Sequence, residues 1–180
     1  HRLCPRWMCF TFDNALRRCF QNPDRIIKPF VHEGDTVLDV GPGIGYFTIP
    51  LARAVGPRGR IIAADIQAAM LRGIAGRASR EGVQDRIVLR LSSQDSIHVA
   101  EEIDFALAFW MVHEIPDLQN FMTQVFRVMK KGGLFLMAEP KFHVSQSQFV
   151  REMDAARSAG FVLKDQPPIP LSSASLFSAP

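Results

Sequence analysis

Residues 36–45 have the sequence TVLDVGPGIG, in which a short run of apolar and β-branched residues leads into three closely spaced glycines. The run predicts a buried strand over residues 36–40, and the glycines predict a tight turn into a helix over residues 46–55. A second β-branched run over residues 60–64 stops at Asp65. Strand, glycine turn, helix and strand together form one βαβ unit, which is the building block of a parallel sheet.

The rest of the chain continues this alternation of strands and helices. Asn22 is a predicted N-cap of a helix that ends near Val31, and residues 130–133 (KKGG) are expected to end a helix that starts at Pro116. Pro50 falls inside the predicted helix 46–55, where it is expected to remove a hydrogen bond, with a bend as a possible consequence. The other expected elements are helices over residues 67–80 and 145–160 and strands over residues 86–91, 103–109, 134–138, 161–164 and 175–177. This order predicts an α/β fold with an open, doubly wound, mainly parallel sheet that has helices on both faces.

The length of 180 residues fits a single domain, which we place at residues 1–180. Hydrophobic residues make up 47% and charged residues 22%, which is typical of globular proteins and excludes a disordered or collagen-like chain. The longest apolar run, Phe105–Val112, is too short for a membrane span, and no signal-like segment begins the sequence. Three cysteines near the start, at positions 4, 9 and 19, have no disulfide-like or metal-like spacing. We therefore expect a cytoplasmic protein in a reducing compartment.

The formal charge of +3 is spread along the chain. Nucleic-acid-binding proteins usually gather their basic residues in one stripe or patch. We therefore expect no nucleic-acid partner, and the sequence indicates no oligomeric state.

The candidate site lies at the carboxyl ends of the predicted strands, where doubly wound sheets bind their ligands. Asp39 is in the first strand beside the glycine turn, and Asp65 ends the second strand. An acid about 20 residues after such a turn accepts hydrogen bonds from the hydroxyls of a ribose. The dinucleotide fingerprint requires a third glycine where this chain has Tyr46, which argues against a nicotinamide cofactor. For the glycines alone, a tight structural turn is an equally acceptable interpretation.

The sequence resembles class I S-adenosylmethionine-dependent methyltransferases, most nearly the small type 11-like group, over about residues 22–164. Their first motif corresponds to VLDVGPGIG at residues 37–45, and their second to IIAADI at residues 61–66 followed by Met70-Leu71. The resemblance continues at residues 103–104, 112–117 and 126–134. It implies a seven-stranded sheet whose strand 7 is antiparallel, S-adenosyl-L-methionine as the cofactor, and methyl transfer to an unidentified small-molecule acceptor. Residues 1–33 would form a partial lid over a cofactor-binding core at residues 34–180.

The resemblance also implies roles for single residues. Asp39 and the glycine turn would hold the methionine end of the cofactor, Asp65 the ribose, and Ile66 one face of the adenine. Many relatives have an acid where this chain has Ser92, so Asp95 or a backbone group is the alternative contact at the adenine rim. Phe109 would close over the cofactor, unless it is an ordinary core aromatic. The expected cofactor-binding residues are Asp39, Gly41, Pro42, Gly43, Gly45, Asp65, Ile66, Ser92, Asp95 and Phe109.

His113 is the candidate catalytic residue. It follows the fourth predicted strand, and an imidazole has a pKa suited to taking a proton from an acceptor. The alternative is a packed structural histidine. The Asn- or Asp-Pro-Pro motif of relatives that methylate amino groups is absent here, where residues 109–112 are FWMV.

Two other functions stay open on the sequence alone. Thiolates of the N-terminal cysteines could bind a soft metalloid such as arsenite before its methylation, as in one branch of the family, although buried structural cysteines would give the same pattern. We expect no metal site. The chain could also be a non-catalytic module that binds S-adenosylmethionine or acts through a partner.

Overall fold

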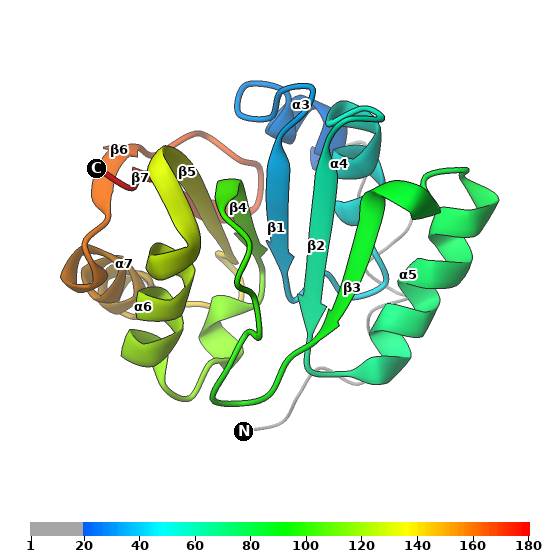
Figure 1. The fold of residues 1–180 in the computed structure, drawn as a ribbon. Coiled ribbons are helices and arrows are strands. Elements are labelled where there is room, and N and C mark those ends of the chain that lie inside the picture. The colour runs from blue at the N-terminus through cyan, green and yellow to red at the C-terminus, as the bar shows by residue number, and fades with distance from the viewer. Residues whose placement is uncertain (1–19) are drawn as a thin grey trace.

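A seven-stranded sheet forms the centre of the computed structural model, which describes residues 20–180 (Figure 1). The strands lie in the order β3-β2-β1-β4-β5-β7-β6. Strand β7 runs antiparallel to both of its neighbours, and the pairs among β1 to β5 are all parallel. The strands are β1 (Thr36–Val40), β2 (Arg60–Asp65), β3 (Ile87–Leu91), β4 (Ile103–Phe109), β5 (Met129–Pro140), β6 (Val162–Asp165) and β7 (Ser172–Ser178). The predicted doubly wound sheet with an antiparallel strand 7 is therefore confirmed.

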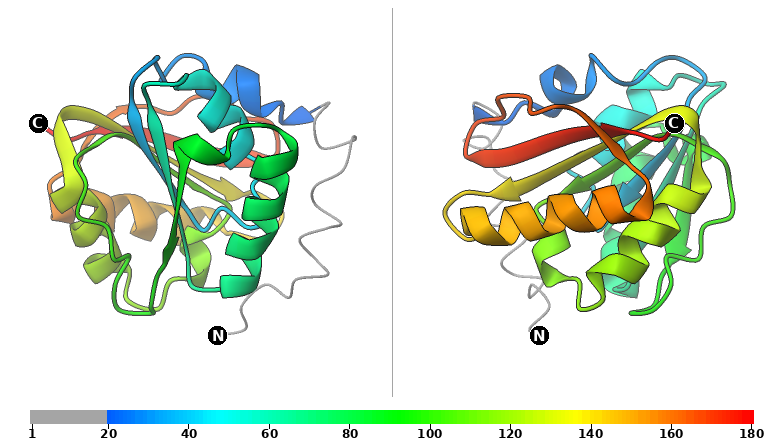
Figure 2. Two further views of the ribbon diagram at one scale, coloured as in Figure 1. Left: turned by 45° about the vertical axis from the view of Figure 1, so that its right-hand side comes forward. Right: turned by 90° about the vertical axis from the view of Figure 1, so that its left-hand side faces the viewer.

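Helices cover both faces of the sheet, as the alternating sequence pattern predicts. The helices are α3 (Pro23–Ile27), α4 (Thr48–Ala54), α5 (Ala68–Arg80), α6 (Leu118–Val128) and α7 (Gln146–Ala159), with short 3-10 turns η1 (Gln84–Arg86) and η2 (Val112–Glu114). Alternate residues of the central strands pack against α6 and α7 on one face, and the residues between them pack against α3, α4 and α5 on the other. The right-hand view of Figure 2 shows α6 and α7 below the sheet and α3 above it. Because both faces are covered, the central strands are buried along nearly their whole length.

The helix caps follow the sequence signals. The Asn22 side chain accepts hydrogen bonds from the backbone of Asp24 and Arg25 at the start of α3, and Ser145 accepts one from Gln148 at the start of α7. Helix α3 ends at Ile27, earlier than the expected Val31. Pro29 explains the shorter helix, because it has no backbone N–H to continue the hydrogen-bond pattern.

The predicted placement of Pro50 in the helix interior, with loss of a hydrogen bond, is wrong. Helix α4 begins at Thr48 rather than at Tyr46, so Pro50 is its third residue. The first N–H groups of a helix have no partner within the helix, and proline at this position removes no hydrogen bond.

The predicted end of the helix before β5 is also wrong. Helix α6 ends at Val128, and residues 130–133 belong to the long strand β5. Lys130 binds the Asp104 carboxylate through its Nζ atom, 2.8 Å from both oxygens, and the Gly132 N–H donates to the Ala179 carbonyl. These partners on β4 and the C-terminal segment stabilise an extended conformation over a helical one.

Among residues 20–180, none of the helices has the length and apolar character that crossing a membrane requires.

Candidate functional site

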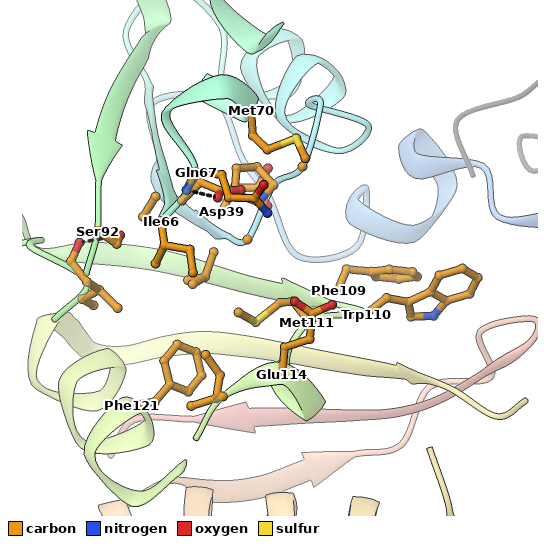
Figure 3. A pocket seen from close by; sticks show the side chains of 18 of the residues that line it. Asp39, Ile66, Gln67, Met70, Ser92, Phe109, Trp110, Met111, Glu114 and Phe121 are labelled. Atoms are coloured by element: carbon orange, nitrogen blue, oxygen red, sulfur yellow. Dashed lines mark hydrogen bonds between the residues drawn. The ribbon is translucent and has the colours of Figure 1, made fainter. Parts of the chain in front are cut away.

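A cavity of about 640 Å³ opens at the carboxyl ends of the strands, beside the point where the strand order reverses between β1 and β4. Such switch points are where doubly wound sheets bind their ligands. The loops after β1, β2, β3, β4 and β5 all contribute to its wall. In Figure 3, Ile66, Ser92 and Phe121 lie toward one end of the cavity and Phe109 and Trp110 toward the other.

The glycine turn after β1 forms part of this wall. Gly41, Pro42 and Gly43 line the cavity. Gly43 has a φ of +56°, and a Cβ placed on it would have no atom within 4 Å. The backbone at Gly43 is therefore open to a ligand that a side chain would keep away. Gly45 does not belong to the cavity lining, and a Cβ there would lie 3.2 Å from Ile74 of α5.

Asp39 is buried, with 2% of its surface exposed, and lines the cavity. Its Oδ2 accepts a hydrogen bond of 2.7 Å from the Thr48 hydroxyl at the start of α4. Burial raises the pKa of Asp39 to about 7; the Thr48 hydrogen bond lowers it and the nearby Asp65 raises it further. The carboxylate form of Asp39 would therefore gain from a cation placed in the cavity.

Asp65 ends β2 on the same wall of the cavity. Its Oδ1 accepts a hydrogen bond of 2.8 Å from the Gln67 backbone N–H. Burial raises the pKa of Asp65 to about 6, while the backbone N–H groups of Gln67 and Gly43 lower it and the charge of Glu114 raises it. A carboxylate has about four lone-pair sites, which is more than these backbone N–H groups use, so Asp65 has capacity for hydroxyl donors.

The charged side chains that line the cavity are mainly acidic. Its described lining contains three acids, Asp39, Asp65 and Glu114, and neither a lysine nor an arginine. A buried carboxylate is costly unless an opposite charge or hydrogen bonds compensate it. These acceptor groups therefore fit a ligand with positive charge and hydroxyl groups, and they do not fit the pyrophosphate of a dinucleotide.

The predicted adenine contacts lie in two places. Ile66 and Ser92 line the cavity, whereas Asp95 does not. The Asp95 carbonyl accepts hydrogen bonds from the side chains of Asn120 and Gln124 on α6, which holds this loop against the helix. Asn120 and Gln124 line the cavity themselves, together with Phe121. No sequence signal identifies these three as part of the site, because only the packing of α6 against the loop after β3 brings them there.

Aromatic side chains form the other end of the cavity. The Phe109 ring packs at a tilt against Phe47, with ring centroids 4.4 Å apart, and contacts Trp110 at 5.8 Å. Trp110 contacts Phe142 at 5.4 Å and donates a hydrogen bond from Nε1 to the Ser172 hydroxyl. Trp110 also has a φ of +61°, which is unusual for a residue with a bulky side chain and is typical of functional sites. Tyr46 completes this apolar wall.

His113 lines the cavity on η2, and its Nδ1 contacts Oε2 of Glu139 at the end of β5. Glu139 is fully buried, and its Oε1 accepts a hydrogen bond of 2.8 Å from the Val112 N–H. Burial lowers the pKa of His113, but the hydrogen bond and negative charge of Glu139 outweigh it, so the pKa is raised above its usual value. The His143 ring packs edge-on against the His113 ring, with centroids 4.9 Å apart.

Part of the expected lid lies outside the described residues, including Cys4, Cys9 and Cys19 and the aromatic residues before Phe20. In the described part of that segment, Gln21 contacts Tyr46 of the aromatic wall and the loop before β7. The Tyr46 hydroxyl donates to the Gln21 carbonyl at 2.8 Å, and the Gln21 side chain donates to the Pro170 carbonyl.

The fold and cavity together define a doubly wound α/β protein with a cavity at the switch point of its sheet. A family model described as a methyltransferase domain matches residues 31–165. The chain belongs to this family, the class I S-adenosylmethionine-dependent methyltransferases, and S-adenosyl-L-methionine is the cofactor of that family.

Two curated relatives have names from quinone biosynthesis. A demethylmenaquinone methyltransferase of Symbiobacterium thermophilum is 29% identical over 107 residues, which cover 59% of this chain and 43% of the relative. A ubiquinone biosynthesis O-methyltransferase of Paramagnetospirillum magneticum is 32% identical over 119 residues, which cover 66% of this chain and 45% of the relative. The matches therefore span less than half the length of either relative.

A solved structure has a similar fold over its whole length. The crystal structure of a SAM-dependent methyltransferase from Aquifex aeolicus matches with a TM-score of 0.89 at 20% identity, covering 99% of this chain and 100% of that chain. At this identity the match supports the fold alone.

Proposed function

We propose that this chain transfers a methyl group from S-adenosylmethionine to a small aromatic acceptor. The observation that carries the proposal is the acidic cavity at the switch point, in which two buried aspartates flank the glycine turn and no described lysine or arginine lines the wall. S-adenosylmethionine is a cation with ribose hydroxyls, which matches these negatively charged hydrogen-bond acceptors.

Each part of the cavity has a role in this proposal. Asp65 would accept the ribose hydroxyls, and Asp39 with Gly41 and Gly43 would hold the charged methionine end. Ile66 and Ser92 would contact the adenine, and Phe109 would lie near the sulfonium. Bound S-adenosylmethionine supplies a methyl group on an already activated leaving group. Positioning by the walls can then supply much of the acceleration, on the order of 7–11 kcal/mol in favourable cases.

The aromatic end of the cavity supports an aromatic, apolar acceptor. Phe47, Phe109, Trp110 and Phe142 offer ring faces and edges against which a planar molecule can pack. The two curated relatives are named for quinone biosynthesis, which is chemistry on such rings. We therefore propose a phenol or hydroquinone as the acceptor class.

A phenol or hydroquinone must lose a proton, and His113 is the proposed general base. Its Nδ1 is engaged by Glu139, and its Nε2 has no hydrogen-bond partner within residues 20–180. A base of this kind contributes roughly 10²–10⁴-fold to a rate.

Isothermal titration calorimetry with S-adenosylhomocysteine, the demethylated product, tests the binding half of the proposal. We expect the wild-type protein to bind, and Asp65→Ala to weaken binding by at least about 10-fold, because hydrogen bonds to a charged acceptor are worth about 1.5–3 kcal/mol each. Asp85→Ala is the matched control, since Asp85 is exposed and remote from the cavity. Binding of NAD without binding of S-adenosylhomocysteine would overturn the proposal.

Transfer of a labelled methyl group from S-adenosylmethionine to a panel of phenols and hydroquinones tests the catalytic half. Wild-type protein should label at least one member of the panel. Labelling of amines alone, with no phenol or hydroquinone product, would reject the proposed acceptor class.

A further inference from the structure

Glu139 is a third buried acid of the site, and the binding of a cofactor does not explain it. It lies near the carboxyl end of β5, none of its surface is exposed, and it is not part of the cavity lining. Both of its oxygens are used on η2: Oε1 by the Val112 N–H at 2.8 Å and Oε2 by His113 Nδ1. One carboxylate therefore fixes the backbone before His113 and the His113 ring itself.

The surroundings of His113 contain more acid than base. Glu139 faces it from β5, Glu114 is beside it on η2, and Glu152 acts on it from α7, which packs against η2. His143, from the turn after β5, is the other titratable group against the ring. Three carboxyl groups around one imidazole stabilise its protonated form over its neutral form.

Glu152 is unusual among these acids. It is 2% exposed, and neither of its oxygens has a hydrogen-bond partner of normal geometry within residues 20–180. Burial raises its pKa to about 7; the charge of Glu139 raises it further, while the charge of His113 and a hydrogen bond from the Gln148 side chain lower it. A buried acid with no well-formed hydrogen bond is costly to the fold, which indicates a gain elsewhere.

We propose that Glu139 is a positioning residue that makes His113 the base, and that Glu152 adjusts how strongly His113 holds the proton. This inference rests on the proposed function. Glu139 accepts the hydrogen bond from Nδ1–H of neutral His113, which leaves the lone pair on Nε2 as the only basic position of the ring.

The proton transfer balances within this group. The O–H bond of the acceptor breaks, its electron pair stays on the acceptor oxygen, and the proton joins the lone pair of His113 Nε2. His113 becomes an imidazolium ion next to the Glu139 carboxylate, which gains the opposite charge it lacked. The proton later passes from Nε2 to water at the open side of the cavity.

Long-range ¹H–¹⁵N NMR of the His113 ring in the unliganded protein tests the proposal without any need for activity. We expect wild-type His113 to carry its proton on Nδ1 when neutral, with a pKa above the usual value of about 6.5. Glu139→Gln should lower that pKa and reduce the Nδ1–H population. Unchanged tautomer and pKa in Glu139→Gln would overturn the proposal.

Kinetics give the second readout. The acid limb of the pH profile for methyl transfer reflects loss of the neutral base, so in Glu139→Gln it should move to lower pH while kcat falls by at least about 10-fold. The affinity for S-adenosylhomocysteine should stay within about 3-fold, because Glu139 does not line the cavity. An equal loss of cofactor affinity would show a merely structural role.

Three further variants separate the loss of the Glu139 charge from a general loss of structure. Glu139→Asp keeps the charge and should retain part of the raised pKa if Glu139→Gln does not fold. Glu152→Gln removes a negative charge without emptying the site, and should lower the His113 pKa by less than Glu139→Gln does. Glu102→Gln is the matched control on an exposed residue and should change nothing. If the wild-type protein methylates no acceptor while the NMR expectations hold, the proposed function fails and the His113–Glu139 pairing stands.

Discussion

Asp39 and Asp65 are buried carboxyl groups whose negative charge has no described lysine or arginine beside it in the cavity. Their raised pKa values, about 7 and about 6, follow mainly from burial. In the unliganded protein both groups therefore hold a proton well above the pH at which an exposed aspartate loses it. A cationic ligand would favour their ionised forms.

This property makes cofactor affinity depend on pH. A cation binds the ionised carboxylates, so binding lowers both pKa values and releases protons. From about pH 5.5 to about pH 7, the affinity for S-adenosylmethionine should rise by about 10-fold or more, given pKa values of about 7 and about 6. Calorimetry at pH 6.5 in two buffers of different ionisation enthalpy measures the release directly.

The sign of the effect is the critical result of that experiment. Net proton uptake, or an affinity that falls as the pH rises over this range, would mean that the ligand does not pair with these acids. Asp39→Asn should remove the larger part of the pH dependence, because Asp39 has the higher pKa.

At the residue scale, the sequence predicted the acids at the ends of β1 and β2 but not the role of Glu139. Asp39 and Asp65 could be identified because each lies at the end of a predicted strand, and Asp39 also lies beside the glycine turn. Glu139 ends β5 in the same way, yet its partners on η2 lie 26 and 27 positions earlier in the chain. Only the pairing of β4 with β5 brings them together.

At the element scale, the turn between β1 and α4 forms part of the cavity wall at the edge of the sheet. Gly43 lies in this turn with a φ of +56° and an open space where a Cβ would be. Gly82, between α5 and η1, has nearly the same backbone conformation, with a φ of +66° and no atom within 4 Å of the position a Cβ would take, but it lies away from the cavity. The two glycines therefore allow backbone strain to be separated from ligand access.

Gly43→Ala and Gly82→Ala should lose similar folding free energy, roughly 1–2 kcal/mol, because each places a Cβ in the left-handed region. Only Gly43→Ala should also weaken the binding of S-adenosylhomocysteine, by about 10-fold or more, because its methyl group enters the cavity. Urea unfolding gives the first quantity and calorimetry the second. Equal affinities for the two variants would show that the turn does not approach the ligand.

The elements themselves were largely predictable from sequence, and their ends less so. The caps at Asn22 and Ser145 and the βαβ pattern are local signals, and the structure confirms them. The boundary between α6 and β5 depends on distant partners, since Lys130 binds Asp104 and Gly132 pairs with Ala179. A lysine-glycine segment favours a helix end in isolation, and tertiary pairing overrides that preference here.

At the scale of the whole molecule, the strand order explains why residues far apart in the chain share one cavity. The order β3-β2-β1-β4-β5-β7-β6 places the carboxyl ends of β1 and β4 side by side, with the chain leaving them in opposite directions across the sheet (Figure 1). The adenine end of the proposed site lies on the β2 and β3 side, and the aromatic acceptor end on the β4 and β5 side (Figure 3). The proposed cofactor and acceptor would therefore lie side by side at the carboxyl ends of the central strands.

The class of cofactor was predictable from the sequence, but the aromatic wall of the cavity was not. The resemblance of several motifs, in the same order along the chain, to class I methyltransferases predicted the fold and the cofactor. The aromatic contacts among Phe47, Phe109, Trp110 and Phe142 join three separate segments, and no spacing in the sequence reveals them.

The most direct measurement is a crystal structure of the chain with S-adenosylhomocysteine. We expect the ribose hydroxyls within hydrogen-bond distance of the Asp65 carboxylate, the amino group of the ligand beside Asp39 and the turn at Gly41, and the sulfur directed toward Phe109 and His113. Density for the ligand at any other place, with side chains filling the space between β1 and β4, would contradict the assignment of this cavity to the adenosyl cofactor.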